Sequence, residues 1–524
     1  MTSSRLGWRN IIQVWRASVG QCFPVTAAEG RCYPAEQILE EKKALMSLAV
    51  STAEQIAGTK HSLTSPRKLI GYFFSVALPL ALWFAPIPLD VTAKHAMAVS
   101  SFMIVAWITE VLPHALTGMV GCYLFWVLNV VKFETAFSGF ADQTPWFLVG
   151  AVLIGAMATK SGLARRLAYL VLRRVGTSYS RLLLGLILTS FMLTFLVPSG
   201  IACVIIMASV ALGLMEVFGV GRGSNIGRGI FITLTYTSGM FDKIVMSGVA
   251  SILGRGLIQK ATGIEIYWSR WLLAFFPVAV VVIFFLWRLV VWLYPPEKQT
   301  LEGGQAYLEG ELAKMGPWTN VEKRALCLLL IAIALWATDL LHHISPAIIG
   351  IGAGLFAALP VFGILNEEDL KRVNYLPVFF TAAAVSMGIV LTETKALQAM
   401  TSVMFAWMRP LITNMVSIAV VPYWTAFVYH IFLASELSML ATSIPPLMNF
   451  AKSSGLPILP IGLVWAFAAG GKIFVYQSGV MVAGYSFGYF DARDLFRVGL
   501  CLTIVESLVL LVLVPFYWPL IGIR

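Results

Sequence analysis

The sequence predicts an all-α polytopic membrane protein with about eleven transmembrane helices plus two re-entrant hairpins, arranged as an inverted-topology repeat. Three observations lead to this fold class. Of the 524 residues, 59% are hydrophobic and 12% are charged, with a mean hydropathy of +0.83, whereas soluble domains carry about a quarter of their residues as charge. The apolar residues gather in segments long enough to cross a bilayer. The order of spans and broken segments also recurs in the two halves of the chain.

The charge and motif content exclude several classes of protein. Lys and Arg collect in the cytoplasmic loops of membrane proteins, so the net charge of +11 indicates a lipid bilayer as partner and no nucleic acid. Motifs for nucleotide binding, nucleophilic catalysis and paired carboxylates are missing, which argues against an enzyme and against an ATP-driven pump. The cysteines lack metal-ligand spacing, and no cofactor is expected. They are Cys22, Cys32, Cys122, Cys203, Cys327 and Cys501.

The N-terminal 68 residues form a polar and basic segment that we expect in the cytoplasm. Trp8, Ile11, Ile12 and Trp15 share one helical face flanked by arginines. Such a face suits a helix lying on an anionic membrane surface, or equally a helix packed on the protein's own cytoplasmic side. The first span is expected within 69–94.

Repeat one is predicted over 95–293. Five arginines between 165 and 181 mark a cytoplasmic loop. The apolar stretch that follows is broken at Pro198-Ser199-Gly200 and has cytoplasmic-type charge on both flanks, so it leaves and returns on one side. The expected parts are spans near 95–112, 115–131 and 144–163, a hairpin at about 182–218, a broken span at about 230–258 and a span at 271–293.

A cytoplasmic linker is predicted over 294–324, and repeat two over 325–524. The second hairpin is interrupted at Ser435-Glu436-Leu437. Counting crossings from a cytoplasmic N-terminus places the C-terminus outside. The expected parts are spans near 325–342, 346–364 and 376–397, a hairpin at about 411–450, a broken span at about 461–490 and a last span at 498–519.

One local match supports the repeat. Gly239 is followed, after seven residues, by Ser247-Gly248-Val249, and Gly470 is followed at the same spacing by Ser478-Gly479-Val480. Interruptions are therefore expected in both spans, at 239–248 and between Gly470 and Gly479. Because an odd number of spans separates the halves, the second copy is inverted.

These breaks indicate a binding site near the middle of the membrane. Helix ends inside a bilayer expose amides that attract anions and carbonyls that suit cations, and inverted-repeat carriers build their substrate pockets from such ends. The candidate substrate-binding residues are Ser199, Gly200, Ser247, Gly248, Ser435, Glu436, Gln477, Ser478 and Gly479.

Charged residues in the breaks need a partner or a function, because each costs about 2.5–3.5 kcal/mol at the bilayer centre. They are Asp242, Lys243, Glu436 and Lys472. One interpretation is a structural ion pair of Glu436 with Lys243 or Lys472. The other is that a lysine meets an anionic substrate while a carboxylate takes a coupling cation or proton.

The histidines are interpreted as interfacial residues, since none has a metal-ligand partner at helical spacing. His430 precedes the second hairpin tip and is the best candidate for a proton relay. The others are His61, His95, His114, His342 and His343.

Three passages of the sequence resemble motifs of a known family. They are Thr109-Glu110-Val111-Leu112-Pro113 with Thr117, the run 162–185 with Gly162-Leu163-Ala164-Arg165-Arg166 and Val175-Gly176-Thr177-Ser178, and Asp494-Leu495-Phe496-Arg497-Val498-Gly499. On these passages the chain resembles the divalent-anion:sodium symporter family, whose members carry dicarboxylates, tricarboxylates or sulfate. The similarity extends over roughly 68–522.

The hairpin tips depart from the family pattern. In the family each tip has Ser-Asn-Thr, which helps to hold a substrate carboxylate and to frame a sodium ion. Here only Ser199 and Ser435 match, so the resemblance implies possible sodium sites near these two serines. The lysines of the breaks can supply the positive charge that sodium would otherwise provide, and a protonatable Glu436 is a candidate replacement for sodium in coupling.

The resemblance implies a homodimeric, cation-coupled secondary transporter of a small anion in a bacterial inner membrane, working by elevator-like alternating access. The coupling ion is sodium or a proton. The alternatives are a proton-coupled carrier or anion exchanger without sodium dependence, and a membrane sensor that kept the scaffold and lost transport.

Overall fold

The computed structural model describes residues 66–524 except 177, 198, 299–302 and 434. The described residues belong to one compact unit, Ala53–Arg524. The predicted cytoplasmic N-terminal segment, with its membrane-surface helix, lies outside the described residues up to residue 65.

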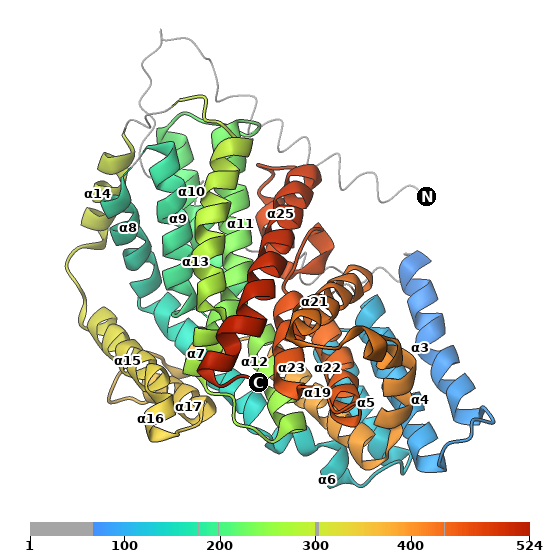
Figure 1. Ribbon diagram of the computed structural model, residues 1–524. Helices are drawn as coiled ribbons and strands as arrows, with labels where there is room; N and C mark the ends of the chain where they lie inside the picture. The colour runs from blue at the N-terminus through green and yellow to red at the C-terminus, as the bar shows by residue number, and fades with distance from the viewer. Residues whose placement is uncertain (1–65, 177, 198, 299–302, 434) are drawn as a thin grey trace, which may run out of the picture. The chain divides into compact units, whose positions relative to one another are not determined.

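The elements are helices, drawn in Figure 1. Those before the linker are α3 (Pro66–Phe84), α4 (Val91–Thr109), α5 (His114–Val127), α6 (Phe133–Ala136), η1 (Ser138–Ala141), α7 (Gln143–Lys160), α8 (Leu163–Val175), α9 (Tyr179–Thr194), α10 (Gly200–Val217), α11 (Asn225–Val245), α12 (Val249–Thr262) and α13 (Trp268–Leu293). Those of the linker and beyond are α14 (Gly304–Met315), α15 (Asn320–Ala337), α16 (Asp339–His342), α17 (Pro346–Ala358), α18 (Glu367–Arg372), α19 (Leu376–Glu393), α20 (Ala396–Phe405), η2 (Ala406–Leu411), α21 (Met415–Phe432), α22 (Glu436–Ser453), α23 (Ile458–Ala468), η3 (Val475–Gln477), α24 (Gly479–Ser486), α25 (Ala492–Val512), η4 (Leu513–Tyr517) and η5 (Trp518–Ile521).

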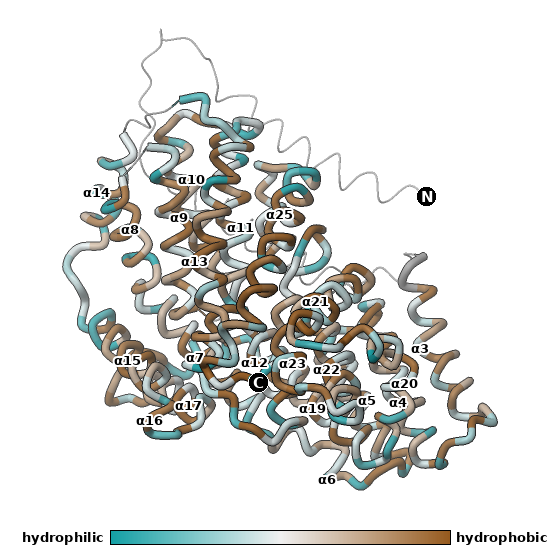
Figure 2. The backbone as a smooth tube through the Cα atoms, in the orientation of Figure 1, coloured by the Kyte–Doolittle hydropathy of each residue, from teal (hydrophilic) through white to brown (hydrophobic). Residues whose placement is uncertain are grey.

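Within the described ranges, six helical segments are long and apolar enough to cross a membrane. They are α4, α10, α13, α19, α21 and the segment from α25 to Ile521. Helices α7 and α8, which meet at a bend of 66°, make a seventh if they count as one span. Figure 2 shows hydrophobic residues along these helices and hydrophilic stretches at many helix ends. The chain is therefore a polytopic helical membrane protein.

Helix α11 lies at the centre of the elements that form the site. It packs against α9, α10, α13 and α24, and Figure 1 shows it beside α10 and α13. Its continuation, α12, packs against α22 and α23 from the second half of the chain. Helices 200 residues apart in the sequence are thereby brought together around the interrupted segments.

The described helix boundaries agree with the expected positions of both hairpin interruptions. Helix α9 ends at Thr194 and α10 begins at Gly200, while α21 ends at Phe432 and α22 begins at Glu436. Ser199 is the N-cap of α10, where its hydroxyl accepts a hydrogen bond from the amide of Ala202 at 3.3 Å. That each pair re-enters the membrane from one side stays a prediction.

The first interrupted span differs in detail from the expectation. Helix α11 continues through Gly239, Asp242 and Lys243, and the interruption is confined to Met246–Gly248. Met246 adopts the left-handed conformation with φ of 56° and ends the helix. Gly239 permits close packing inside the helix, because a Cβ there would lie 3.3 Å from Val480.

The second interruption lies where it was expected and is longer than the first. Helix α23 ends at Ala468, a turn and extended chain follow, and α24 begins at Gly479. The matching sequence motifs therefore adopt different local structures. The first copy stays α-helical from Gly239 to Val245, whereas the second is not α-helical between Gly470 and Ser478.

A buried ion pair connects the linker to the first half of the chain. Arg166 on α8 donates to both carboxylate oxygens of Glu322 at 2.6 and 3.2 Å and also to the carbonyl of Gly316. Burial favours a higher pKa for Glu322, but hydrogen bonds from Arg166 and from the amide of Thr319 lower its pKa below the ordinary value. The pair holds the start of α15 against α8.

Candidate functional site

The site is formed where the first hairpin tip meets α11 and the second interruption. A Cβ added to Gly200 would lie 2.7 Å from the carbonyl oxygen of Ser238 and 2.7 Å from a methyl of Val480. A Cβ on Gly479 would lie 2.9 Å from Ile201. Glycine at these positions lets the starts of α10 and α24 approach each other and the α11 backbone.

Lys472 and Glu436 form a buried ion pair between the second interruption and the second hairpin. The Nζ of Lys472 lies 2.9 Å from Oε2 of Glu436, and the two side chains are 3% and 12% exposed. The same ammonium group donates to the carbonyl of Gly239 at 3.1 Å. Of the two partners expected for Glu436, the structure brings Lys472 to it.

Lys243 pairs with a residue that the sequence analysis missed. Its Nζ lies 3.0 Å from Oε2 of Glu506 on α25, with both side chains 3% exposed. The hydroxyl of Tyr423 on α21 donates to the same oxygen at 3.2 Å. Glu506 is a carboxylate within an apolar span, and the cost of such a residue was the signal that could have identified it.

Asp242 brings the two pairs into one cluster. Its carboxylate is within electrostatic range of Lys472, Glu436 and Lys243. Its main-chain carbonyl accepts a hydrogen bond from the hydroxyl of Ser251 at 3.0 Å. We call Asp242, Lys243, Glu436, Lys472 and Glu506 the charge cluster.

A cavity of about 20 Å³, large enough for one water molecule, adjoins the charge cluster. The polar side chains that line it include Lys472, Glu506 and Thr503. It lies between α11, α25 and the second interruption, so the faces of both interrupted spans meet at it. Its other lining residues are Tyr236, Gly239, Met240, Gly470, Gly471, Met481, Gly499 and Leu502.

Gln477 and His430 shape the second interruption. The side-chain oxygen of Gln477 accepts hydrogen bonds from the amides of Ile473 and Phe474 at 2.7 and 2.8 Å. The ring nitrogens of His430 lie 3.2 Å from the carbonyl oxygens of Gly471 and Gln477. Both side chains are fully buried, and their contacts with main-chain groups stabilise the second interruption.

The candidate serines occupy different surroundings. Ser199 is exposed and Ser435 is half-buried, whereas the hydroxyl of Ser478 caps α24 by accepting from the amide of Val480 at 3.3 Å. The buried hydroxyl of Ser247 has no hydrogen-bond partner within the described part of the chain. The predicted contacts of these serines with a ligand stay predictions.

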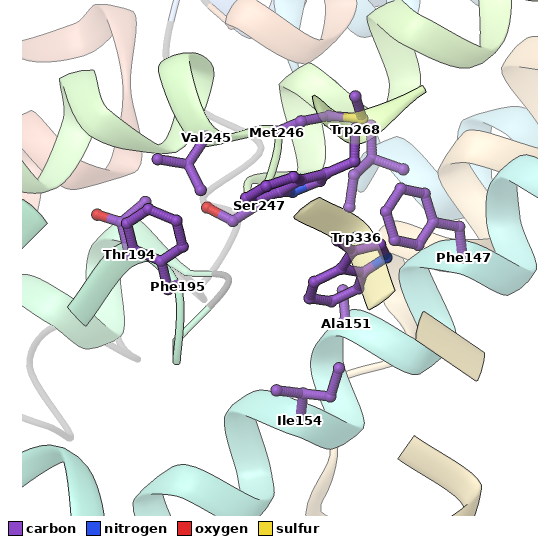
Figure 3. A pocket seen from close by; sticks show the side chains of 11 residues that line it. Phe147, Ala151, Ile154, Thr194, Phe195, Val245, Met246, Ser247, Trp268 and Trp336 are labelled. Atoms are coloured by element: carbon purple, nitrogen blue, oxygen red, sulfur yellow. The ribbon is translucent and has the colours of Figure 1, made fainter. Parts of the chain in front are cut away.

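Ser247 lines a second pocket, away from the lysines. Figure 3 shows Ser247 with Thr194 and Phe195 on one side and the rings of Trp268 and Trp336 on the other. Hydrophobic and aromatic side chains make up most of this wall. Ser478 does not line this pocket, although the sequence match predicted equivalent roles for the two serines.

Across residues 66–524, apart from the undescribed positions, no group of three or more His, Cys, Asp and Glu residues could hold a metal ion. The sodium sites expected near Ser199 and Ser435 stay a prediction.

Comparison with known proteins connects this chain to a family. The model of the sodium:sulfate symporter transmembrane region matches residues 66–524. A membrane protein of Cupriavidus necator is 26% identical over 86% of this chain and 93% of its own length. The putative malate transporter of Bacillus subtilis is 25% identical, covering 87% and 97%. Dicarboxylate transporter 1 of Arabidopsis thaliana chloroplasts is 25% identical, covering 86% and 82%.

Proposed function

This chain belongs to the sodium:sulfate symporter family, that is, the divalent anion:sodium symporters, and on this premise we propose that it is a secondary active transporter of a small dicarboxylate. Relatives that cover most of the chain are named for malate or dicarboxylate transport. The family relationship also supports a carrier rather than an enzyme.

The observation that carries the proposal is the buried Lys472–Glu436 pair at the second interruption. In this conformation the carboxylate of Glu436 neutralises an ammonium group that would be costly to bury alone. A substrate carboxylate has the same charge and hydrogen-bonding capacity as Glu436. We propose that the substrate replaces Glu436 as the partner of Lys472.

We propose the membrane architecture that the sequence predicts. Five shorter apolar helices, α3 from Leu69, α5, α9, α17 and α23, accompany the longer ones. Together with the helix pairs around each interruption they support about eleven spans and two re-entrant hairpins. We also propose that the N-terminus lies in the cytoplasm and the C-terminus outside a bacterial inner membrane, as the charge pattern of the loops indicates. The family relationship supports a homodimer with elevator-type movement.

The coupling ion is sodium or a proton. Hairpin tips without Ser-Asn-Thr favour a proton-coupled carrier or an anion exchanger over strict sodium symport. Lys472 supplies positive charge at the proposed substrate position once Glu436 leaves it.

Proteoliposomes that contain the full chain test the proposal. Uptake of labelled succinate, malate, citrate, sulfate and a monocarboxylate is measured under a sodium gradient, under a proton gradient, and with internal counter-anion. We expect uptake of succinate or malate and little uptake of the monocarboxylate. If no anion moves under any of these conditions, the transport proposal is wrong and a sensor on the carrier scaffold replaces it.

A further inference from the structure

Both ring nitrogens of His430 face carbonyl oxygens, and a neutral imidazole cannot donate a hydrogen bond to both. Its Nδ1 is 3.2 Å from the carbonyl oxygen of Gly471 and its Nε2 is 3.2 Å from that of Gln477. A neutral ring has one N–H donor and one lone pair, whereas an imidazolium donates from both nitrogens. With the ring fully buried, a neutral form would direct its lone pair at a carbonyl oxygen.

The charge cluster favours one additional proton. Asp242, Glu436 and Glu506 are three carboxylates, and Lys243 and Lys472 are two ammonium groups. In the fully ionised form the cluster therefore has one excess negative charge in a buried site, which is costly. An imidazolium at His430 would bring the sum to zero.

Two charged groups of opposite sign surround the ring. Glu436 at the start of α22 and Lys472 in the second interruption are the charged groups in electrostatic range of His430. The charge of Lys472 is offset by Glu436, 2.9 Å away. Glu506 on α25 contacts the helix that carries His430. Its carboxylate accepts a hydrogen bond from Tyr423, which lies seven residues before His430 in the sequence.

We propose that His430 is an imidazolium in this conformation and holds the coupling proton of the carrier, an inference that rests on the transport function proposed above. The charged ring joins α21 to the unwound segment through both carbonyls. When the proton leaves, one of these hydrogen bonds becomes a contact between a lone pair and an oxygen. Protonation therefore stabilises this arrangement of the second hairpin and the second interruption.

The protonation state is measured without any transport assay, so this inference can fail separately from the proposed function. The full chain is labelled with ¹⁵N-histidine, reconstituted in lipid and studied by solid-state NMR at pH 8, where exposed histidines are neutral. We expect one imidazolium signal, and we expect His430→Gln to remove it. The matched control is His114→Gln, because His114 has a single side-chain partner, Ser438, at 2.9 Å, and should remove a neutral signal.

A second variant covers the case in which His430→Gln does not fold. Replacing the other five histidines by Gln leaves His430 alone, and its signal must be that of an imidazolium at pH 8. A neutral signal in this variant, or no charged histidine in the natural chain at that pH, overturns the assignment.

Coupling is then tested by uptake of labelled succinate. His430→Gln should lose the stimulation by an inward proton gradient and retain exchange of external for internal succinate. Lys371→Gln, at an exposed ion pair, should retain the stimulation. Loss of stimulation in Asp242→Asn alone, with His430→Gln unaffected, would assign the proton to Asp242 and contradict the proposal.

Discussion

At the scale of single residues, the site consists of charges that neutralise one another. Lys243 and Lys472 each have a carboxylate within 3.0 Å. Taking one member from a buried pair leaves the other without compensation, at a cost of about 3–5 kcal/mol. The two pairs differ in access, because Glu436 is 12% exposed and Glu506 is 3% exposed. We therefore assign Glu506 a structural role and Glu436 a role that changes with the substrate.

Glu506→Gln should destabilise the protein by about 3–5 kcal/mol, because Lys243 stays buried without a carboxylate. The measurement is thermal unfolding in detergent. Glu367→Gln is the matched control, since Glu367 pairs with Lys371 at an exposed position and such pairs contribute about 0–1 kcal/mol. Equal melting temperatures for the two variants would argue against a buried Lys243–Glu506 pair.

Glu436→Gln should strengthen the binding of a dicarboxylate, because it removes the internal carboxylate that occupies Lys472. We expect succinate to bind about tenfold more tightly, which corresponds to about 1.4 kcal/mol. Calorimetric titration of the full chain with succinate measures the effect. Weaker binding in this variant would mean that Glu436 assists the substrate and does not compete with it.

At the scale of elements, close contacts join helices that are distant in the sequence. Helices α7 and α17 cross at Gly150, where a Cβ would lie 2.2 Å from the backbone of Gly350. Small residues at such crossings are typical of membrane helix packing. The ion pair of Arg166 and Glu322 makes a second junction, between α8 and α15.

Gly150→Ala should destabilise the protein by about 1–3 kcal/mol, because backbone atoms of α17 cannot move aside easily. Gly352→Ala on α17 is the control, since nothing lies within 4 Å of its Cβ position and alanine favours the helix by about 1 kcal/mol. The melting temperature of the control should be higher than that of the natural chain, and the melting temperature of Gly150→Ala should be lower. The reverse order would contradict the crossing.

The Arg166–Glu322 junction gives a prediction for pH. The folded-state pKa of Glu322 is lowered, so its contribution to stability is present above the unfolded pKa of about 4.3 and is lost as the pH falls through the folded value. The melting temperature of Glu322→Gln should be well below that of the natural chain at pH 7, with the gap narrowing below about pH 4.3. A gap that is constant with pH would show that Glu322 does not act through its charge.

Much of the element order could be predicted because polar residues, glycine and proline interrupt otherwise apolar segments. The interruptions around Ser199, Ser435 and Gly470 are of this kind. The first interrupted span was harder, since Gly239 lies inside a helix and serves close packing with Val480. Which carboxylate pairs with each lysine depends on which helices become neighbours in the fold. Glu506 reaches Lys243 because α25 packs beside α11 and α21.

At the scale of the whole molecule, the family relationship covers residues 66–524, and the helices of both halves meet at the charge cluster. The composition predicted the membrane class, and the motifs predicted the family. The substrate and the coupling ion depend on how the cluster responds to a bound anion. The central claim is that Lys472 receives a substrate carboxylate.

The most direct test is counterflow of labelled succinate in proteoliposomes loaded with unlabelled succinate, which needs no ion gradient. The natural chain should accumulate label. Lys472→Gln should reduce the rate by about tenfold or more, equivalent to at least about 1.4 kcal/mol, while Lys371→Gln, at an exposed pair, should leave it unchanged. Counterflow in Lys472→Gln at the rate of the natural chain would contradict the account.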